Sequence, residues 1–93
     1  MVRIRELKWS EEKNELLKRE RGLSFEAVLS AYEHDAVLDD LEHPDPSRPH
    51  QRMMIVEIEG YVGIVPYVSE GPVAFLKTIY KSRVMQRKYR GHP

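Results

Sequence analysis

Apolar residues recur at helical spacing in the first part of the chain. Within residues 25–34, Phe25, Val28, Leu29 and Tyr32 follow an i, i+3, i+4, i+7 pattern. This pattern predicts an amphipathic helix with one buried stripe. Such a helix needs another element to pack against.

Capping residues mark where two successive helices begin and end. Ser10 is a favourable N-cap for a helix over residues 11–21, and Gly22 is a favourable residue to end it. A second serine, Ser24, stands before the amphipathic segment over residues 25–34 in the same way. The sequence therefore predicts two helices near the N-terminus.

The hydrophobic period changes to two after Met53. Met54, Val56 and Ile58 fall on one side of an extended chain, whereas Glu57 and the neighbouring Glu59 fall on the other. This alternation predicts a half-buried strand. Glu59 and Gly60 then form a plausible hairpin turn.

Further strands are expected around this one. The sequence favours strands over residues 61–68 and 73–80, and a weaker one over residues 36–41 with Val37 and Leu41 both turned inward. A brief strand is also expected within residues 2–9. Pro66 lacks an amide hydrogen, so its strand should bulge there or leave that position unpaired.

The order of these elements predicts an α+β fold. Two N-terminal helices would pack on a small twisted antiparallel sheet of three to four strands, and a short basic helix over residues 82–89 would end the chain. The 93 residues suit a single domain, residues 1–93, because a chain of this length encloses one core. Residues 43–50 form a proline-rich loop.

Composition excludes several classes of protein. The chain has no cysteine, so it has neither disulfides nor thiolate metal sites, and 41% of its residues are hydrophobic, as in a compact domain. It lacks an apolar run of the roughly 18 residues that a membrane span requires, and Met1 to Arg5 lack a signal-peptide core. We therefore expect a cytoplasmic protein with no membrane partner.

Charge is balanced overall but unevenly distributed along the chain. The formal net charge is +0, yet acids dominate residues 26–45 and bases dominate residues 76–93. The basic segment carries Lys77, Lys81, Arg83, Arg87, Lys88 and Arg90. Such asymmetry suggests two surfaces with different partners.

The basic tail is the first candidate site. Cations on one helix face can hold phosphates, and Tyr80 and Tyr89 offer rings on which bases stack. The predicted RNA-binding residues are Arg52, Arg87, Lys88, Tyr89 and Arg90. The alternative is a solvated helix whose tyrosines pack into the core.

Lys77 interrupts an otherwise apolar strand. Its ammonium group either reaches solvent at the end of the strand or is held at a site near Arg83, where it would neutralise a phosphate. His50 is a possible general base because imidazole titrates near neutral pH. His43, Asp45 and His50 share one loop, but we interpret the loop as structural and predict no metal and no cofactor. The glycines of the chain do not form a nucleotide-binding loop.

Four blocks of sequence together resemble a known family. They are Leu7-Lys8-Trp9, then Glu12-Lys13-Asn14, then Arg21-Gly22-Leu23-Ser24-Phe25-Glu26, and finally Phe75-Leu76-Lys77-Thr78-Ile79-Tyr80-Lys81-Ser82-Arg83. The combination resembles the BrnT-type toxins of bacterial type II toxin–antitoxin systems, which belong to the RelE/ParE-like superfamily.

The resemblance implies a RelE-like fold and metal-independent RNA cleavage that inhibits translation. It also implies a cognate, DNA-binding antitoxin, through which the toxin would reach operator DNA. Lys77 and Arg83 match the late block and would clamp the phosphate, while Tyr80 or Tyr89 would orient the substrate or assist proton transfer. Lys77, Tyr80 and Arg83 are thus the predicted catalytic residues of an endoribonuclease.

A second function stays open. The segment over residues 84–89 lacks the Ala-Thr pair usual in the family, and Pro66 stands where a regular strand is common. In this alternative, the chain is a non-catalytic interaction module, or a degenerate toxin that acts through complex formation and transcriptional control. Both functions require a small partner protein.

Overall fold

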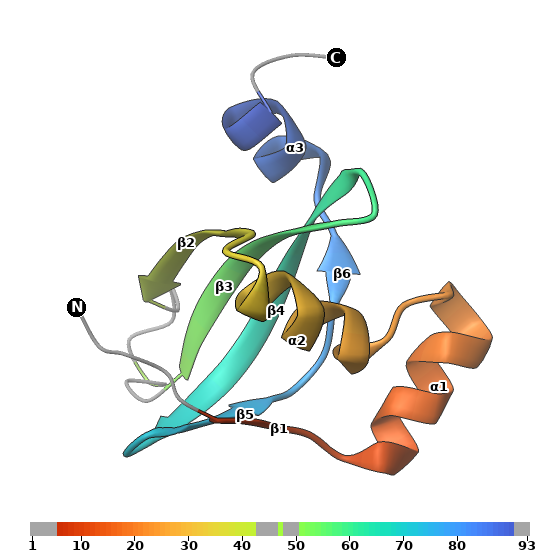
Figure 1. Ribbon diagram of the computed structural model, residues 1–93, viewed down its shortest axis with the longest axis vertical. Helices are drawn as coiled ribbons and strands as arrows, with labels where there is room; N and C mark the ends of the chain where they lie inside the picture. Colours follow the sequence, from red (N-terminus) through yellow and green to blue (C-terminus); the bar gives the residue numbers. More distant parts are fainter. Residues whose placement is uncertain (1–5, 43–46, 48–50, 91–93) are drawn as a thin grey trace.

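One mixed sheet carries helices on both of its faces. The computed structural model describes residues 6–42, 47 and 51–90. Its elements are β1 Glu6–Lys8, α1 Glu11–Arg21, α2 Phe25–Glu33, β2 Val37–Glu42, β3 Gln51–Ile58, β4 Tyr61–Glu70, β5 Val73–Leu76, β6 Tyr80–Lys81 and α3 Arg83–Arg90. The strands lie in the order β1-β5-β4-β3-β2, and β6 also pairs with β4. Figure 1 shows α2 in front of this sheet and α1 standing beside it.

The predicted α+β class is confirmed, but the predicted sheet was wrong in detail. Within the described residues the sheet has six strands rather than three or four, and it is mixed because β1 pairs parallel to β5, with Glu6 opposite Val73 and Lys8 opposite Phe75. The brief strand expected within residues 2–9 is present as β1, and the two helices follow it. β1 has only three residues, of which only Leu7 is apolar, so alternation gives little sign of its pairing.

Pro66 explains why the strand predicted over residues 73–80 is split. The Pro66 carbonyl accepts from the Lys77 amide at 2.9 Å, so the side of Pro66 that lacks an N–H also faces this neighbour. The neighbouring chain leaves the ladder after Leu76 and rejoins β4 at Tyr80, opposite Ile64. The interruption that we expected in the strand of Pro66 therefore occurs in the neighbouring segment, which forms two strands, β5 and β6, instead of one.

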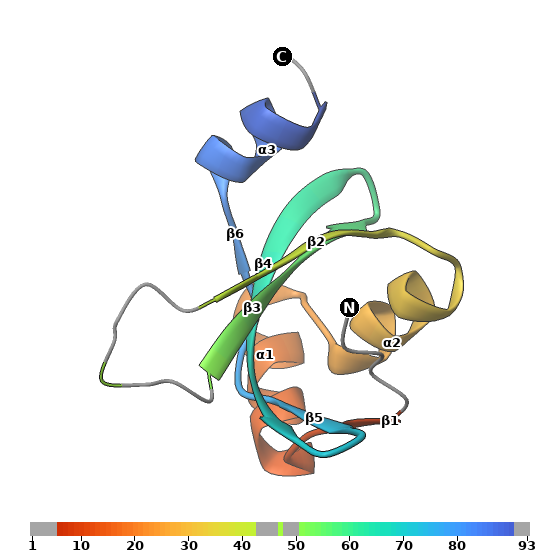
Figure 2. The same ribbon diagram turned by 90° about the vertical axis from the view of Figure 1, so that its left-hand side faces the viewer.

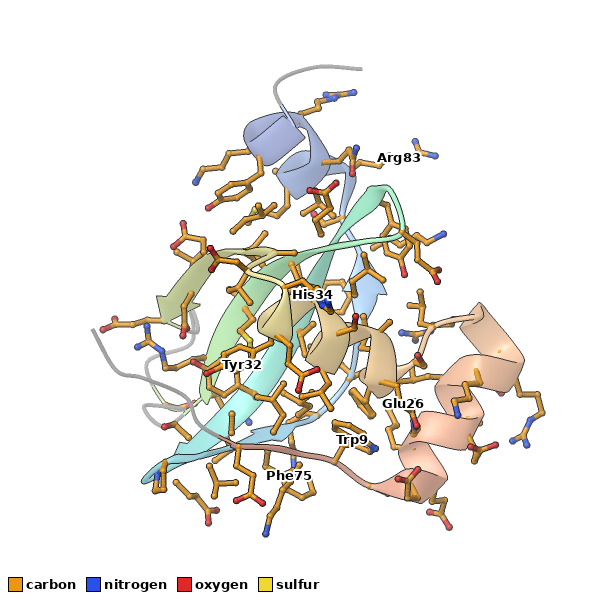
Figure 3. The ribbon with its side chains drawn as sticks, viewed as in Figure 1. Trp9, Glu26, Tyr32, His34, Phe75 and Arg83 are labelled. Carbon is orange, nitrogen blue, oxygen red and sulfur yellow. The ribbon has the colours of Figure 1, made fainter. Side chains whose placement is uncertain are left out.

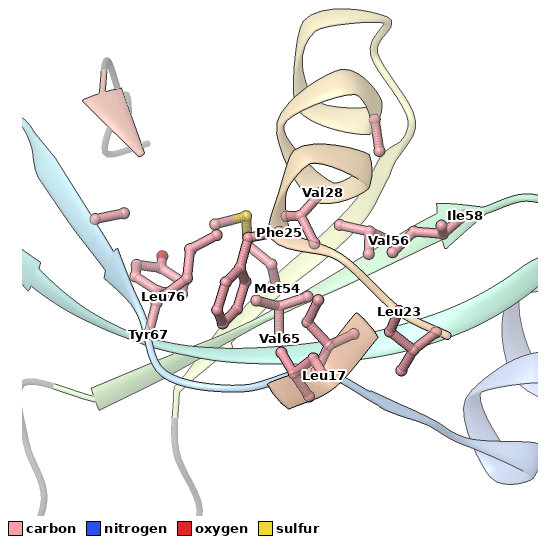
Figure 4. Close-up of a cluster of buried hydrophobic side chains, with 13 residues drawn as sticks. Leu17, Leu23, Phe25, Val28, Met54, Val56, Ile58, Val65, Tyr67 and Leu76 are labelled. Atoms are coloured by element: carbon pink, nitrogen blue, oxygen red, sulfur yellow. The ribbon is translucent and has the colours of Figure 1, made fainter. Parts of the chain in front are cut away.

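Side chains alternate between two apolar faces of the sheet. The first face packs under α1 and α2, where Phe25 and Val28 of α2 meet Met54, Val56 and Val65 (Figure 4). The second face lies on the other side of the same strands, and α3 covers part of it (Figure 2). The predicted grouping of Met54, Val56 and Ile58 on one face of β3 is confirmed.

The prediction of a hairpin turn was correct, whereas the prediction about the faces of β2 was wrong. The hairpin turn at Glu59 and Gly60 is present, and both residues have positive φ values of 48° and 87°, as a tight hairpin turn requires. The prediction that Val37 and Leu41 share a face was wrong. The register of β2 shifts between Val37 and Asp39, so Val37 packs on the first face and Leu41 on the second.

The corner between α1 and α2 is held by a buried asparagine. Asn14 is 0% exposed, its Oδ1 accepts from the Phe25 amide at 2.8 Å, and its Nδ2 donates to Glu26 at 2.8 Å. Trp9 stacks on the Phe25 ring with centroids 5.7 Å apart, and Figure 3 shows Trp9 close to Glu26. The predicted caps Ser10 and Ser24 both accept from backbone amides of their helices. This corner joins the first half of α1 to the start of α2.

Replacement of Asn14 by alanine should destabilise the chain. The variant leaves the Phe25 amide buried without an acceptor, which costs about 1–3 kcal/mol. Urea denaturation of Asn14→Ala should show this loss, whereas the exposed neighbouring substitution Glu12→Ala should change the free energy of unfolding by less than about 0.5 kcal/mol. Equal stability of the two variants would show that the corner does not depend on Asn14.

Candidate functional site

A shallow basic depression lies between the end of α1 and strand β6. Arg21, Leu23, Tyr80 and Lys81 line it. α1 ends here because Gly22 adopts a left-handed conformation with φ 67°, and the next residue, Leu23, turns into the core. Two cations and a phenol from distant parts of the chain thus share one open surface, which suits an anionic ligand with flat rings.

Arg21 is held at this surface by the backbone of the split strand. Its guanidinium donates to the Ile79 carbonyl at 2.9 Å. A guanidinium carries five N–H groups, so this single bond orients the group and leaves donors for a ligand. The remaining N–H groups of this planar group can donate hydrogen bonds to the oxygens of a phosphate.

Lys81 is placed by its strand and by an aromatic ring. β6 pairs with β4 so that Lys81 lies opposite Gly63, and the Lys81 Nζ lies 4.5 Å from the centroid of the Tyr61 ring. This cation–π contact restrains an otherwise flexible side chain. Its charge is thereby kept beside the depression.

The three predicted catalytic residues do not form one cluster. Tyr80 lines the depression, but Lys77 lies just beyond β5 with its Nζ 5.2 Å from the Phe75 ring centroid. Arg83 begins α3, and Figure 3 shows it at the opposite end of the molecule from Phe75. No hydrogen bond or ion pair joins these three described residues to one another. Lys77 and Arg83 therefore do not line the depression together with Tyr80.

The predicted RNA-binding residues also divide into two groups. Arg87 and Lys88 are exposed on α3, and Arg90 is the last residue of that helix. Tyr89 is half-buried, and its hydroxyl donates to Asp39 Oδ2 at 2.5 Å. Its phenol thus anchors α3 to β2.

Arg52 lies on the opposite face of the sheet from α3. Its Nε donates to Asp40 Oδ1 at 2.9 Å, and the Tyr67 hydroxyl donates to the other oxygen of the same carboxylate at 2.6 Å. Burial, and then this hydrogen bond to Asp40, raise the pKa of Tyr67. The bond to Asp40 likewise raises the pKa of Arg52. This trio ties β2, β3 and β4 together, and Arg52 does not join the basic tail.

His43, Asp45 and His50, the residues considered for a metal site and a general base, lie outside the described residues. Within residues 6–42, 47 and 51–90, no group of three or more His, Asp or Glu side chains is arranged to hold a metal ion. In the same ranges, no helix is long and apolar enough to cross a bilayer.

Sequence reasoning missed Arg21 as a site residue. Fifty-eight positions separate Arg21 from Ile79, whose carbonyl it contacts. The only local signal was the basic last turn of α1, which helix-dipole chemistry already explains. Lys81 was noted as part of the basic segment, but the spacing did not show that it faces α1.

α3 is attached to the sheet by a small set of contacts. Met85 and Tyr89 pack on the apolar second face, and the Gln86 side chain accepts from the Val62 amide at 2.8 Å. Ser82 caps the helix by accepting from the Met85 amide. The Tyr89–Asp39 bond reaches furthest across the sheet, from α3 to β2.

The attachment of α3 should depend on pH at both extremes. The bond from Tyr89 lowers the pKa of Asp39 below its ordinary 3.8, so its contribution is present above that value and is lost as pH falls through the lowered pKa. The same bond raises the pKa of Tyr89 above 10.0, so its contribution is present below that value and is lost as pH rises through the raised pKa. The NMR signal of the Met85 methyl group should therefore stay constant between these limits and shift beyond them.

Tyr89→Phe should remove this pH dependence, because it deletes the hydroxyl that joins the two groups. Tyr80→Phe is the matched control, since it deletes an exposed hydroxyl elsewhere and should retain the dependence. An unchanged titration of the Met85 signal in Tyr89→Phe would assign the effect to another group.

Comparison with known proteins provides no family assignment. The chain matches no protein-family model, no curated protein and no solved structure.

Proposed function

We propose that this chain is the toxin of a bacterial type II toxin–antitoxin pair, with a RelE-like fold of the BrnT type, and that it cleaves RNA without a metal ion. The observation that carries the proposal is the basic depression, where Arg21 and Lys81 meet beside Tyr80. Arginine and lysine bind phosphate, and an adjacent tyrosine stacks on a base. A single-stranded RNA offers both phosphates and bases.

The cleavage chemistry uses the ribose of the substrate itself. The 2′-OH gives its proton to a base and attacks the adjacent phosphorus, and the 5′-oxygen of the next nucleotide leaves with a proton. The products are a 2′,3′-cyclic phosphate and a 5′-OH. The protein must therefore neutralise the extra negative charge on the phosphate, which is the role proposed for Arg21 and Lys81.

The remaining cations would hold the RNA on either side of the reacting phosphate. Arg83 and Arg87 extend the basic surface along α3, and Lys77 lies between β5 and β6 in the chain. Tyr80, which lines the depression, is the proposed group for orienting the substrate or assisting proton transfer. The protein would act in the cytoplasm and need no cofactor. A cognate DNA-binding antitoxin would neutralise it and connect it to operator DNA.

A second function is favoured by exposed apolar side chains. Val84 is 72% exposed and Tyr80 is 40% exposed, and they lie four residues apart at the junction of β6 and α3. Two adjoining exposed side chains of this kind are compatible with a contact to another protein. In this alternative the chain is a non-catalytic module that acts through complex formation.

RNA cleavage in EDTA separates the two functions. Purified protein should cut single-stranded RNA, and Arg21→Ala or Lys81→Ala should lower the rate by about 10- to 100-fold, because each removes a charge that stabilises the transition state. Arg19→Ala, an exposed arginine of α1 that does not line the depression, should cut at the normal rate. Lys77→Ala and Arg83→Ala test the outer contacts.

Intact RNA after incubation with the unmodified protein, together with harmless induction in cells, would leave the interaction module as the better explanation. Equal rates for all variants would place the cleavage site elsewhere. Thermal unfolding midpoints should be compared first, because the bond from Arg21 to Ile79 also joins α1 to the split strand.

A further inference from the structure

The two cations of the depression are held by neutral groups of the protein. Arg21 donates to the Ile79 carbonyl, and Lys81 lies over the ring of Tyr61. Neither cation forms an ion pair within the part of the chain that the structure describes. Three other cations are held by carboxylates, which neutralise their charge: Lys8, Lys18 and Arg52. The charge at the depression therefore stays available to an anionic ligand.

The pairing of β6 with β4 determines which ring Lys81 meets. Lys81 lies opposite Gly63, and residues directly opposite one another share a face of the sheet. Tyr61 is two residues from Gly63 along β4, so it is the diagonal neighbour of Lys81 on that face and within reach of a long side chain. The Lys81 Nζ accordingly lies 4.5 Å from the centroid of the Tyr61 ring.

Gly63 leaves the space that this contact needs. A methyl group added at Gly63 would lie 3.6 Å from the Tyr80 carbonyl oxygen and 3.8 Å from the Tyr61 ring, which is ordinary van der Waals contact. A longer side chain there would extend over the same surface as Lys81, because directly opposed residues project on the same side of a sheet. The absence of a side chain at Gly63 thus directs Lys81 to its diagonal neighbour.

Tyr61 is held in place by the core. Its ring is half-buried and packs against the core cluster of the first face, and its backbone pairs with Ile58 across the hairpin. Burial, and then the charge of Glu59, raise the pKa of the Tyr61 hydroxyl above its ordinary 10.0, so the phenol is neutral near neutral pH. A neutral ring attracts a cation through its quadrupole and leaves the charge of that cation unpaired.

We propose that Tyr61 is a positioning residue of the depression, which holds the Lys81 ammonium where a phosphate of the ligand binds. The inference rests on the proposed function, because it takes this ligand to be a single-stranded nucleic acid. A lysine that is already held loses less side-chain freedom on binding than a free one. Removal of the ring should therefore weaken binding, although Tyr61 itself does not touch the phosphate.

Binding of a modified RNA tests the proposal without cleavage. A short single-stranded 2′-O-methyl RNA offers phosphates and bases, but methylation removes the hydroxyl that would attack the phosphorus. In fluorescence anisotropy with EDTA, Tyr61→Leu should bind this probe about two- to fivefold more weakly than the unmodified chain, which is the effect expected of an exposed cation–π contact. Tyr61→Phe keeps the ring and should bind the probe normally.

Tyr32→Leu is the matched control. Tyr32 is also half-buried and packs against the same core cluster, but none of the described cations lies over its ring. This variant should bind the probe as the unmodified chain does. An equal loss of affinity in Tyr32→Leu and Tyr61→Leu would show that general loosening of the core weakens binding, and it would overturn the proposal.

A double-mutant cycle shows whether Tyr61 acts through Lys81. Lys81→Ala removes the cation, so addition of Tyr61→Leu to that variant should cost no further affinity. The same loss in both backgrounds would mean that the ring acts independently of Lys81, contrary to the proposal. All variants are compared below their thermal midpoints, with circular dichroism as the check on folding.

The NMR position of the Lys81 side chain tests the geometry directly. Protons over the face of an aromatic ring resonate upfield, so the Lys81 ε-methylene signal should be shifted upfield in the unmodified chain and in Tyr61→Phe. It should return to the ordinary lysine position in Tyr61→Leu. An ordinary position in the unmodified chain would overturn the proposal, whether or not the probe binds.

Three outcomes separate this inference from the proposed function. Probe binding that Tyr61→Leu leaves unchanged would overturn the positioning role alone. Ring-dependent binding by a chain that does not cleave unmodified RNA would support the positioning role and contradict the ribonuclease activity. Absence of probe binding by the unmodified chain would overturn nucleic-acid binding at the depression, and with it the positioning role.

Discussion

Strand β4 is apolar on both of its faces, and the rest of the structure follows from the need to cover it. Val62 and Ile64 point to one side, Val65 and Tyr67 point to the other, and all four are buried. Because successive side chains of a strand alternate, one helical layer cannot cover both sets. α2 covers one face, with Leu17 of α1 beside it, and α3 is drawn onto the other. The C-terminal helix is thus part of the core packing and not merely a solvated tail.

This constraint also explains the two adjacent acids of β2. Asp39 and Asp40 point to opposite faces, and each accepts a hydrogen bond from a tyrosine there, Tyr89 on one side and Tyr67 on the other. In the sequence the two acids weakened the prediction of a strand, since aspartate is unfavourable in sheets. The tyrosines that compensate for them are 27 and 50 positions away. The local strand propensity of these two residues contains no information about partners so distant in the sequence.

The sequence predicted what depends on neighbours along the chain and missed what depends on distant pairing. The caps of α1 and α2 and the alternation in β3 were all readable from a few adjacent residues. The parallel pairing of β1 with β5 and the bond from Arg21 to Ile79 join segments whose contact leaves no local pattern. The depression depends on such a contact. The basic segment was predicted to supply site residues, but its contact with the end of α1 was not predicted.

The sequence blocks that resemble the BrnT-type toxins have unequal meaning once their contacts are known. Trp9, Asn14, Phe25 and Glu26 contact one another at the α1–α2 corner, where they satisfy a buried amide and stack two rings. A match in that block therefore reports on how two helices are joined, and it bears on fold more than on chemistry. The late block is different, because Tyr80 and Lys81 line the depression while Lys77 lies over the Phe75 ring. The first block is therefore compatible with either of the proposed functions, and only the surface residues of the second block bear on the chemistry.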